Sequence, residues 1–147
     1  MKVIQASSEN LNQLVPLFDG YRAFYKQPSN IEAARTFLTE RFSKKDSIIF
    51  IALDENENGL GFTQLYPSFS SVKMQRTYIL NDLYVLEKAR GKGIGEALMN
   101  KAKEFAIANH SRGLTLETDY DNPAQKLYER LGWKRDNKVF HYTWEIK

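Results

Sequence analysis

The segment from Leu83 to Met99 constrains the fold more than any other part of the chain. It begins with apolar residues typical of a buried strand, passes through three alternating glycines, and continues with apolar residues at helical spacing. A helix that starts directly after such a loop presents the free peptide N–H groups of its first turn. Glycines lack the Cβ atoms that would keep an anion away from the backbone. The segment therefore predicts a phosphate-binding loop at a helix N-terminus.

The spacing of these glycines excludes two common phosphate-binding motifs. A Walker A loop does not fit the residues around Gly91, and the dinucleotide fingerprint fails because Glu96 stands where its third glycine is required. The pattern R-x-x-G-x-G fits Arg90, Gly93 and Gly95. Taken alone, such a loop has a second interpretation, which is a structural turn that binds no phosphate. Its place between a strand and an amphipathic helix favours phosphate binding.

A second informative block runs from Thr118 to Trp133. Asn122-Pro123 is typical of a helix start, and we expect a short helix that ends near Leu131. With the glycine loop, this block resembles the GNAT superfamily of N-acetyltransferases, whose pattern here is N-x-x-A-x-x-x-Y-x-x-x-G-[FW]. The residues that match it in register are Ala124, Tyr128, Gly132 and Trp133.

The resemblance covers Leu80 to Trp133 strongly and departs from the family at one position. The asparagine of the pattern falls at Asp121, and Asn122 follows one place later. An asparagine donates a hydrogen bond to the pantetheine arm of the cofactor, whereas an ionised aspartate cannot. Two alternatives stay open: Asn122 takes this role after a one-residue slip, or it serves only as a helix cap.

The resemblance implies that acetyl-CoA is the co-substrate. We expect no metal, because the only histidines, His110 and His141, lie far apart in the sequence. In the family, a bulge in the strand before the loop frees backbone N–H groups, which bind the acetyl carbonyl. The sequence gives no independent sign of this bulge. The implied cofactor-binding residues are Leu83, Tyr84, Val85, Arg90, Gly91, Lys92, Gly93, Ile94, Gly95, Glu96 and Asn122.

Two residues are the catalytic candidates. By resemblance, Tyr128 is the general acid that protonates the leaving thiolate; its alternative is a core tyrosine beside Leu127 and Leu131. Asp82 interrupts an otherwise apolar strand, and a buried carboxylate is costly unless it is paired. We expect it to bind a cationic amine or to accept its proton through water. Its alternatives are a carboxylate that faces solvent or one that pairs with a lysine or arginine.

The acceptor is predicted to be a primary amine of a small molecule. The chain is most similar to the polyamine and thialysine acetyltransferases, and aromatic faces and carboxylates favour cations. The expected substrate-binding residues are Tyr25, Asn81, Asp82 and Glu117. Packing of the aromatic residues in the core is the alternative. The competing functions are a non-catalytic acyl-CoA sensor and a protein lysine or N-terminal acetyltransferase.

The element pattern predicts an α/β fold in one domain, residues 1–147. Strands and helices follow each other as β-α-α-β-β-β-α-β-α-β, with a further strand at the end. We expect the GNAT fold: a mostly antiparallel sheet of six or seven strands, about four helices, and a splayed parallel pair at the cofactor site. One or two strands are expected within Trp133–Glu145. A bend or break is expected at Pro16 and Gly20, a capping box at Ser29–Glu32, and a loop at Pro67–Ser71.

Composition restricts the remaining possibilities. The chain has no cysteine, which excludes disulfides, thiolate metal sites and a cysteine nucleophile. The net charge of +3 arises from interspersed acids and bases, so we expect no nucleic-acid partner. There is no apolar run of membrane-spanning length and no signal peptide, and we expect a cytoplasmic protein without a membrane partner. The apolar segment Val139–Trp144 is a candidate edge for a homodimer.

Overall fold

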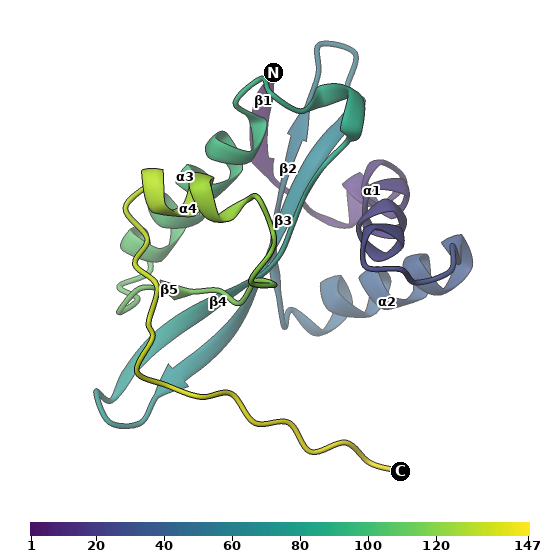
Figure 1. Ribbon diagram of the computed structural model, residues 1–147. Helices are drawn as coiled ribbons and strands as arrows, with labels where there is room; N and C mark the ends of the chain where they lie inside the picture. Colours follow the sequence, from purple (N-terminus) through teal and green to yellow (C-terminus); the bar gives the residue numbers. More distant parts are fainter. The chain divides into compact units, whose positions relative to one another are not determined.

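The computed structural model describes all residues, 1–147, and divides them into two compact units, Met1–Glu117 and Thr118–Lys147. The first unit holds a five-stranded sheet in the order β1-β2-β3-β4-β5 (Figure 1). The first three pairings are antiparallel, and β4 and β5 run parallel. The strands are β1 (Lys2–Gln5), β2 (Ile48–Leu53), β3 (Gly59–Ser70), β4 (Gln75–Val85) and β5 (Leu114–Thr115). The mixed, mostly antiparallel sheet is confirmed, with five strands instead of six or seven.

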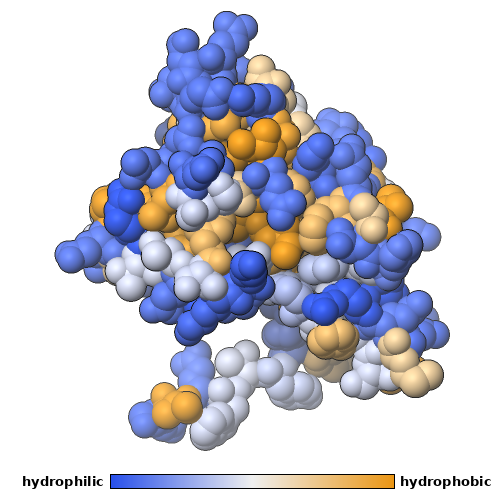
Figure 2. Space-filling model, turned by 180° about the vertical axis from the view of Figure 1, so that it is seen from behind, coloured by the Kyte–Doolittle hydropathy of each residue, from blue (hydrophilic) through white to orange (hydrophobic).

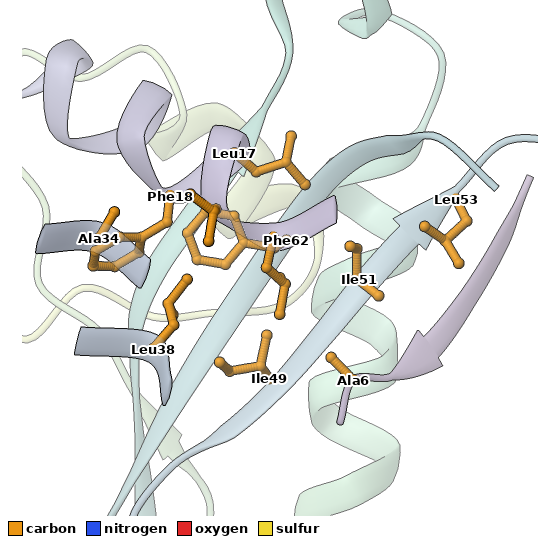
Figure 3. Close-up of a cluster of buried hydrophobic side chains, with 11 residues drawn as sticks. Ala6, Leu17, Phe18, Ala34, Leu38, Ile49, Ile51, Leu53 and Phe62 are labelled. Carbon is orange, nitrogen blue, oxygen red and sulfur yellow. The ribbon is translucent and has the colours of Figure 1, made fainter. Parts of the chain in front are cut away.

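Helices cover both faces of this sheet. The first face carries α1 (Leu11–Phe24), which follows a short 3-10 helix η1 (Ser8–Asn10), and α2 (Ile31–Lys44). The other face carries α3 (Ile94–Ala108), and η2 (Glu87–Ala89) lies between β4 and α3. Ile49 and Ile51 point toward α1 and α2, where they pack with Phe18 and Phe62 (Figure 3). Because Phe50 instead packs on Phe105 of α3, β2 is buried on both faces, as its apolar run predicts.

Helix α1 continues through Pro16, so the predicted break is wrong. Pro16 lies on the exposed side, where water can bond the carbonyl that loses its helical partner. Gly20 instead allows close packing, because a Cβ there would lie 2.7 Å from the Tyr84 hydroxyl oxygen. The predicted capping box at Ser29 is also wrong. Asn30 is the N-cap of α2, and its side chain accepts a hydrogen bond from the Ala33 N–H.

Asp19 links α1 to the start of α2. It is buried, and its carboxylate accepts hydrogen bonds from the Ser29 hydroxyl and the Asn30 N–H, both at 2.7 Å. The bond from Ser29 and then the bond from Asn30 hold the pKa of Asp19 below its ordinary value. The Ser29 hydroxyl therefore bonds Asp19 and does not cap α2.

We expect Asp19→Ala to lower the free energy of unfolding by about 1–3 kcal/mol at neutral pH, because two bonds to a charged group are lost. The folded state lowers this pKa, so the stabilisation is present above the unfolded pKa and lost as pH falls through the folded one. Urea unfolding across acidic and neutral pH measures the difference between the variant and the wild type. A difference that persists unchanged into strong acid would contradict this role.

Strand β3 extends through Pro67 to Ser70, where the sequence predicts a loop. Pairing of β3 with β2 ends at Leu65, while pairing with β4 continues to Ser70. Pro67 therefore lies where β3 is an edge strand, and its missing N–H costs no ladder bond on the free side. The turn falls later, between Ser71 and Met74.

The second unit contains α4 (Gln125–Arg130) and no strand. The strands predicted within Trp133–Glu145 are absent, although the segment has aromatic residues at a spacing of two. Phe140, Tyr142 and Trp144 are 83–89% exposed. A strand needs a partner for its backbone groups, and this unit offers none. A homodimer through this segment stays a prediction.

The surface is mixed in character. Figure 2 shows hydrophilic and hydrophobic residues interspersed on one face, with hydrophobic residues also gathered near its centre. None of the helices is both long and apolar enough to cross a bilayer.

Candidate functional site

Strands β4 and β5 separate after a short parallel contact. Their ladder consists of Tyr78 with Leu114 and Ile79 with Thr115, whereas β4 continues to Val85. Beyond Ile79, the β4 backbone therefore has no partner in β5. The splayed parallel pair that the sequence predicts is present in the first unit (Figure 1).

A bulge in β4 lies directly beyond this point. Gln64 of β3 is opposite Asp82, but the next residue of β3, Leu65, is opposite Leu80. Asn81 is thus an extra residue without a partner in the β3 register. The bulge implied by the family resemblance is present.

The ladder with β3 sets the direction of the peptide groups that follow. The Leu86 N–H donates to the Leu60 carbonyl and therefore points toward β3. Along an antiparallel pair, the N–H groups of successive residues point alternately toward and away from the partner strand. The N–H groups of Leu83 and Val85 consequently point away from β3, toward the side that β5 leaves open. The Val85 carbonyl has the same direction, because it accepts a bond from Arg90 Nε at 3.0 Å.

The glycine loop connects the end of β4 to α3. Gly91 and Gly93 have φ values of +77° and +80°, which favour glycine, and a Cβ at either would meet no atom within 4 Å. Gly93 is the N-cap of α3 and no side chain caps this end; the first helical bond runs from Ala97 N to the Gly93 carbonyl. An uncapped helix start beside open glycines fits a pyrophosphate group.

Two cations lie in this loop. Arg90 and Lys92 are exposed, and the Arg90 guanidinium lies 5.8 Å from the ring centroids of both Phe24 and Tyr84. The bond from Arg90 to Val85 ties the loop to the end of β4. The other guanidinium nitrogens remain suited to a phosphate oxygen.

Asp82 is 2% exposed, which contradicts the alternative of a solvent-facing carboxylate. It pairs with neither lysine nor arginine. Its Oδ2 accepts a bond from Gln64 Nε2 at 2.6 Å, and its Oδ1 accepts one from Asn81 Nδ2 at 2.7 Å. Burial raises the pKa of Asp82, and the bonds from Asn81, Gln64 and Tyr21 oppose this rise.

Two tyrosines adjoin this carboxyl. Burial and then the charge of Asp82 raise the pKa of Tyr21, and the same causes raise that of Tyr66 to about 12. The Tyr21 hydroxyl donates to the Asn81 carbonyl at 3.2 Å. Both phenols therefore stay protonated near neutral pH and can donate hydrogen bonds.

Asp82→Asn is expected to change the pH dependence of stability in the opposite sense to the Asp19 variant. The folded state raises the pKa of Asp82, so its contribution is fully present below the unfolded pKa and is lost as pH rises through the folded pKa. Asparagine does not titrate, so relative to the wild type the variant gains stability over that interval. Urea unfolding from pH 3 to pH 8 measures this, with exposed Glu55→Gln as the control. A variant whose free energy of unfolding instead falls steadily relative to that of the wild type as pH rises would contradict this prediction.

The predicted substrate-binding residues are partly brought together. Tyr25 follows α1 and is 41% exposed, and its ring centroid lies 5.1 Å from that of Tyr21. Tyr21 in turn contacts Asn81, whose side chain bonds Asp82. Glu117 is exposed and lies two residues after β5, and its place at the substrate site stays a prediction.

The second unit contains the remaining candidates. Tyr128 lies on α4, half-buried, with its ring centroid 6.5 Å from that of Trp133. Asn122 Oδ1 accepts a bond from the Ala124 N–H at 2.9 Å, so it supports the turn before α4. The N-cap of α4 is Ala124 and no side chain caps this end, so the prediction that Asn122 caps the helix is wrong: its side chain holds the preceding turn, and the helix begins after it. A contact between Asn122 and the cofactor stays a prediction.

Comparison with known proteins identifies the family. The family model "Acetyltransferase (GNAT) family" matches residues 14–133. The chain belongs to the GNAT acetyltransferase family. An uncharacterized N-acetyltransferase of Bacillus subtilis is 46% identical over 99% of this chain and 98% of its own length. The crystal structure of a probable acetyltransferase has 44% identity and a TM-score of 0.94, and the match covers 100% of this chain and 99% of that one.

A more distant relative carries a more specific name. The D-amino-acid N-acetyltransferase of Saccharomyces cerevisiae is 29% identical over 84% of this chain and 79% of its own length. GNAT enzymes use acetyl-CoA, and the glycine loop of this GNAT chain offers the features that its pyrophosphate requires. No group of three or more potential ligand side chains for a metal occurs in the structure.

Sequence reasoning missed several residues at the site of this GNAT protein. Thr63 and Gln64 are both 0% exposed and bond Asp82, and the Tyr21 hydroxyl contacts the bulge. A signal was available, because Thr63-Gln64 is a polar pair inside the apolar run of β3. Their function depends on strand register, which the sequence does not reveal.

Proposed function

We propose that the protein transfers an acetyl group from acetyl-CoA to a primary amine of a small molecule, by direct attack of the amine in a ternary complex. One observation carries the proposal: the splayed, bulged end of β4 leads directly into the open glycine loop and the uncapped start of α3. Peptide donors for an acetyl carbonyl and donors for a pyrophosphate thus follow one another along a single segment of chain.

In the proposed reaction, the amine nitrogen forms a bond to the acetyl carbon and the carbon–sulfur bond breaks. The N–H groups of Leu83 and Val85 are the donors proposed for the carbonyl oxygen, on which negative charge develops. The backbone from Gly91 to Glu96, with Arg90 and Lys92, is proposed to hold the phosphates. Leu83, Tyr84 and Val85 are proposed to line the pantetheine arm.

Two proton transfers complete the reaction. Asp82 is the proposed acceptor of the amine proton, through water because its carboxyl is buried. A raised pKa brings a carboxyl closer to the range of an effective base at neutral pH. Tyr128 is the proposed donor to the leaving thiolate, as the family motif implies. Proton exchange with solvent then restores the Asp82 carboxylate and the Tyr128 phenol.

A small cationic acceptor is supported by the character of the residues beside the bulge. Tyr25 offers a partly exposed aromatic face and Asn81 an exposed amide; Glu117, which lies two residues after β5, is proposed to add an exposed carboxylate. Aromatic faces and carboxylates attract ammonium groups. The name of the yeast relative, a D-amino-acid N-acetyltransferase, also supports a small amine as the acceptor class.

The acceptor class is tested by incubating the protein with acetyl-CoA and one amine at a time, and measuring acetylated product by mass spectrometry. The panel contains spermidine, lysine and thialysine, D-amino acids, an aminoglycoside and basic peptides. Acetylation of small amines well above that of peptides is expected. Preference for peptides would replace the small-molecule proposal with a protein acetyltransferase, and binding without any product would favour the sensor function.

A further inference from the structure

Buried polar residues are few in this chain and most of them occur at one place. Asp19, Thr63, Gln64 and Asp82 are the buried polar or charged residues, and Asp19 has its own function at the start of α2. The other three adjoin each other where β3 meets the bulge of β4. A buried polar group costs stability unless it is hydrogen-bonded. The three buried polar residues at the bulge therefore require hydrogen-bond partners.

Thr63 and Gln64 hold Asp82 from opposite faces of the sheet. Adjacent residues of a strand point to opposite faces. The Thr63 hydroxyl donates to the Asp82 main-chain carbonyl at 2.8 Å, and Gln64 Nε2 donates to the Asp82 carboxyl at 2.6 Å. One residue therefore fixes the backbone of Asp82 and the other fixes its side chain.

The bulged residue itself is held from α1 and from Asp82. The Tyr21 hydroxyl donates to the Asn81 carbonyl, and Asn81 Nδ2 donates to the Asp82 carboxyl. Asn81 has no partner in the β3 register, so these side-chain bonds replace the ladder contact that the bulge removes.

We propose that Thr63 and Gln64 are positioning residues, which fix the bulged segment Asn81-Asp82 and thereby aim the N–H groups of Leu83 and Val85 at the acetyl carbonyl. The inference rests on the proposed function, because it assigns those N–H groups to the acetyl group. Leu83 follows Asp82 directly, so a rotation of the Asp82 peptide changes the direction of the Leu83 N–H. Displacement of about 1 Å in reacting groups costs on the order of 10²-fold in rate.

The test compares Thr63→Val and Gln64→Met, which keep shape and remove one hydrogen bond each. Thr77→Val is the matched control, because Thr77 lies in β4 before the bulge and its hydroxyl also donates to a main-chain carbonyl, that of Gly113. Backbone amide NMR of each protein is recorded with CoA and with acetyl-CoA. The shift difference between the two ligands at Leu83 and Val85 reports the contact with the acetyl group.

In the wild type and in Thr77→Val, we expect this acetyl-specific shift at Leu83 and Val85. In Thr63→Val and Gln64→Met it is lost or reduced, and kcat falls about tenfold or more, within the range for misplaced reacting groups. The Kd for CoA changes less than about twofold, since the phosphate loop is untouched. Thr63→Ser restores the hydroxyl and with it both the shift and kcat.

Asp82→Asn separates positioning from proton transfer. In this variant, a flip of the Gln64 side-chain amide brings its Oε1 to face position 82. This oxygen has no hydrogen-bond partner in the structure, and it then accepts a bond from the amide introduced by the substitution. We therefore expect the acetyl-specific shift to persist in this variant, while the acidic limb of the pH–rate profile changes.

Wild-type shifts and kcat in both Thr63→Val and Gln64→Met would overturn the positioning role and leave the proposed function intact. A wild type that binds neither CoA nor acetyl-CoA would overturn the proposed function and this inference together. If the wild type binds acetyl-CoA without turnover, the shifts alone decide the positioning role.

Discussion

Tyr128→Phe is expected to lower kcat about 10²–10⁴-fold, the contribution of a well-placed general acid or base. Phenylalanine keeps the ring beside Trp133, whose centroid lies 6.5 Å away, and removes only the hydroxyl. The thiolate then leaves without a positioned proton donor. Steady-state kinetics with saturating amine measures kcat, and calorimetry measures the affinity for acetyl-CoA, which we expect to stay within about twofold because the lost interaction belongs to the transition state.

Tyr142→Phe provides the control for loss of a phenolic hydroxyl. Tyr142 is in the same unit and is 89% exposed, so we expect its kcat to equal that of the wild type. A Tyr128→Phe protein with nearly unchanged kcat would exclude Tyr128 as the acid and favour its alternative as a packing residue. A loss of affinity instead of rate would assign the hydroxyl to cofactor binding.

Gly93→Val is expected to weaken binding of acetyl-CoA and of CoA about 100-fold. A residue other than glycine in the left-handed region costs about 1–2 kcal/mol, and a β-branched residue costs more. The new side chain also occupies the open space beside the start of α3. Each lost hydrogen bond to a charged group contributes a further 1.5–3 kcal/mol or so, and about 1.4 kcal/mol is a tenfold change in Kd.

Calorimetric titration with CoA and acetyl-CoA measures this effect in the absence of any acceptor. Gly113→Ala is the control, because a Cβ at Gly113 also meets no atom within 4 Å and its φ is not positive. Equal affinity of Gly93→Val and the wild type for both ligands would show that the phosphates do not bind at this loop. A similar loss in Gly113→Ala would indicate a general effect on folding.

The sequence predicted the parts of the site that depend on local pattern. A glycine loop between a strand and an amphipathic helix is a local feature, and the structure places it between β4 and α3 as expected. The bulge at Asn81 is different, because it exists only in the pairing of β4 with β3. The polar pair Asn81-Asp82 in an apolar strand drew attention to these residues as substrate and proton-transfer candidates, but it gave no sign of the bulge or of what they contact.

Tertiary context also explains the predictions that failed. Pro16 was expected to bend or break a helix, yet α1 continues through it, because Pro16 lies on the exposed side, where it is tolerated. Pro67 was assigned to a loop, yet β3 is an edge strand there. The closing strands after Trp133 have the correct alternation but no partner strand in their unit. In each case the outcome depends on what packs against the segment or pairs with it, and this information is not present in the local sequence pattern.

Initial velocities of thiol release, with acetyl-CoA and an accepted amine varied together, test the central claim most directly. Direct transfer within a ternary complex predicts double-reciprocal lines that intersect, and no cysteine is present to carry a covalent acetyl group. Intersecting lines, with release that depends on the amine, are the result we expect. Parallel lines would indicate an acetylated enzyme, and release that no amine accelerates would show that the protein is not an amine acetyltransferase.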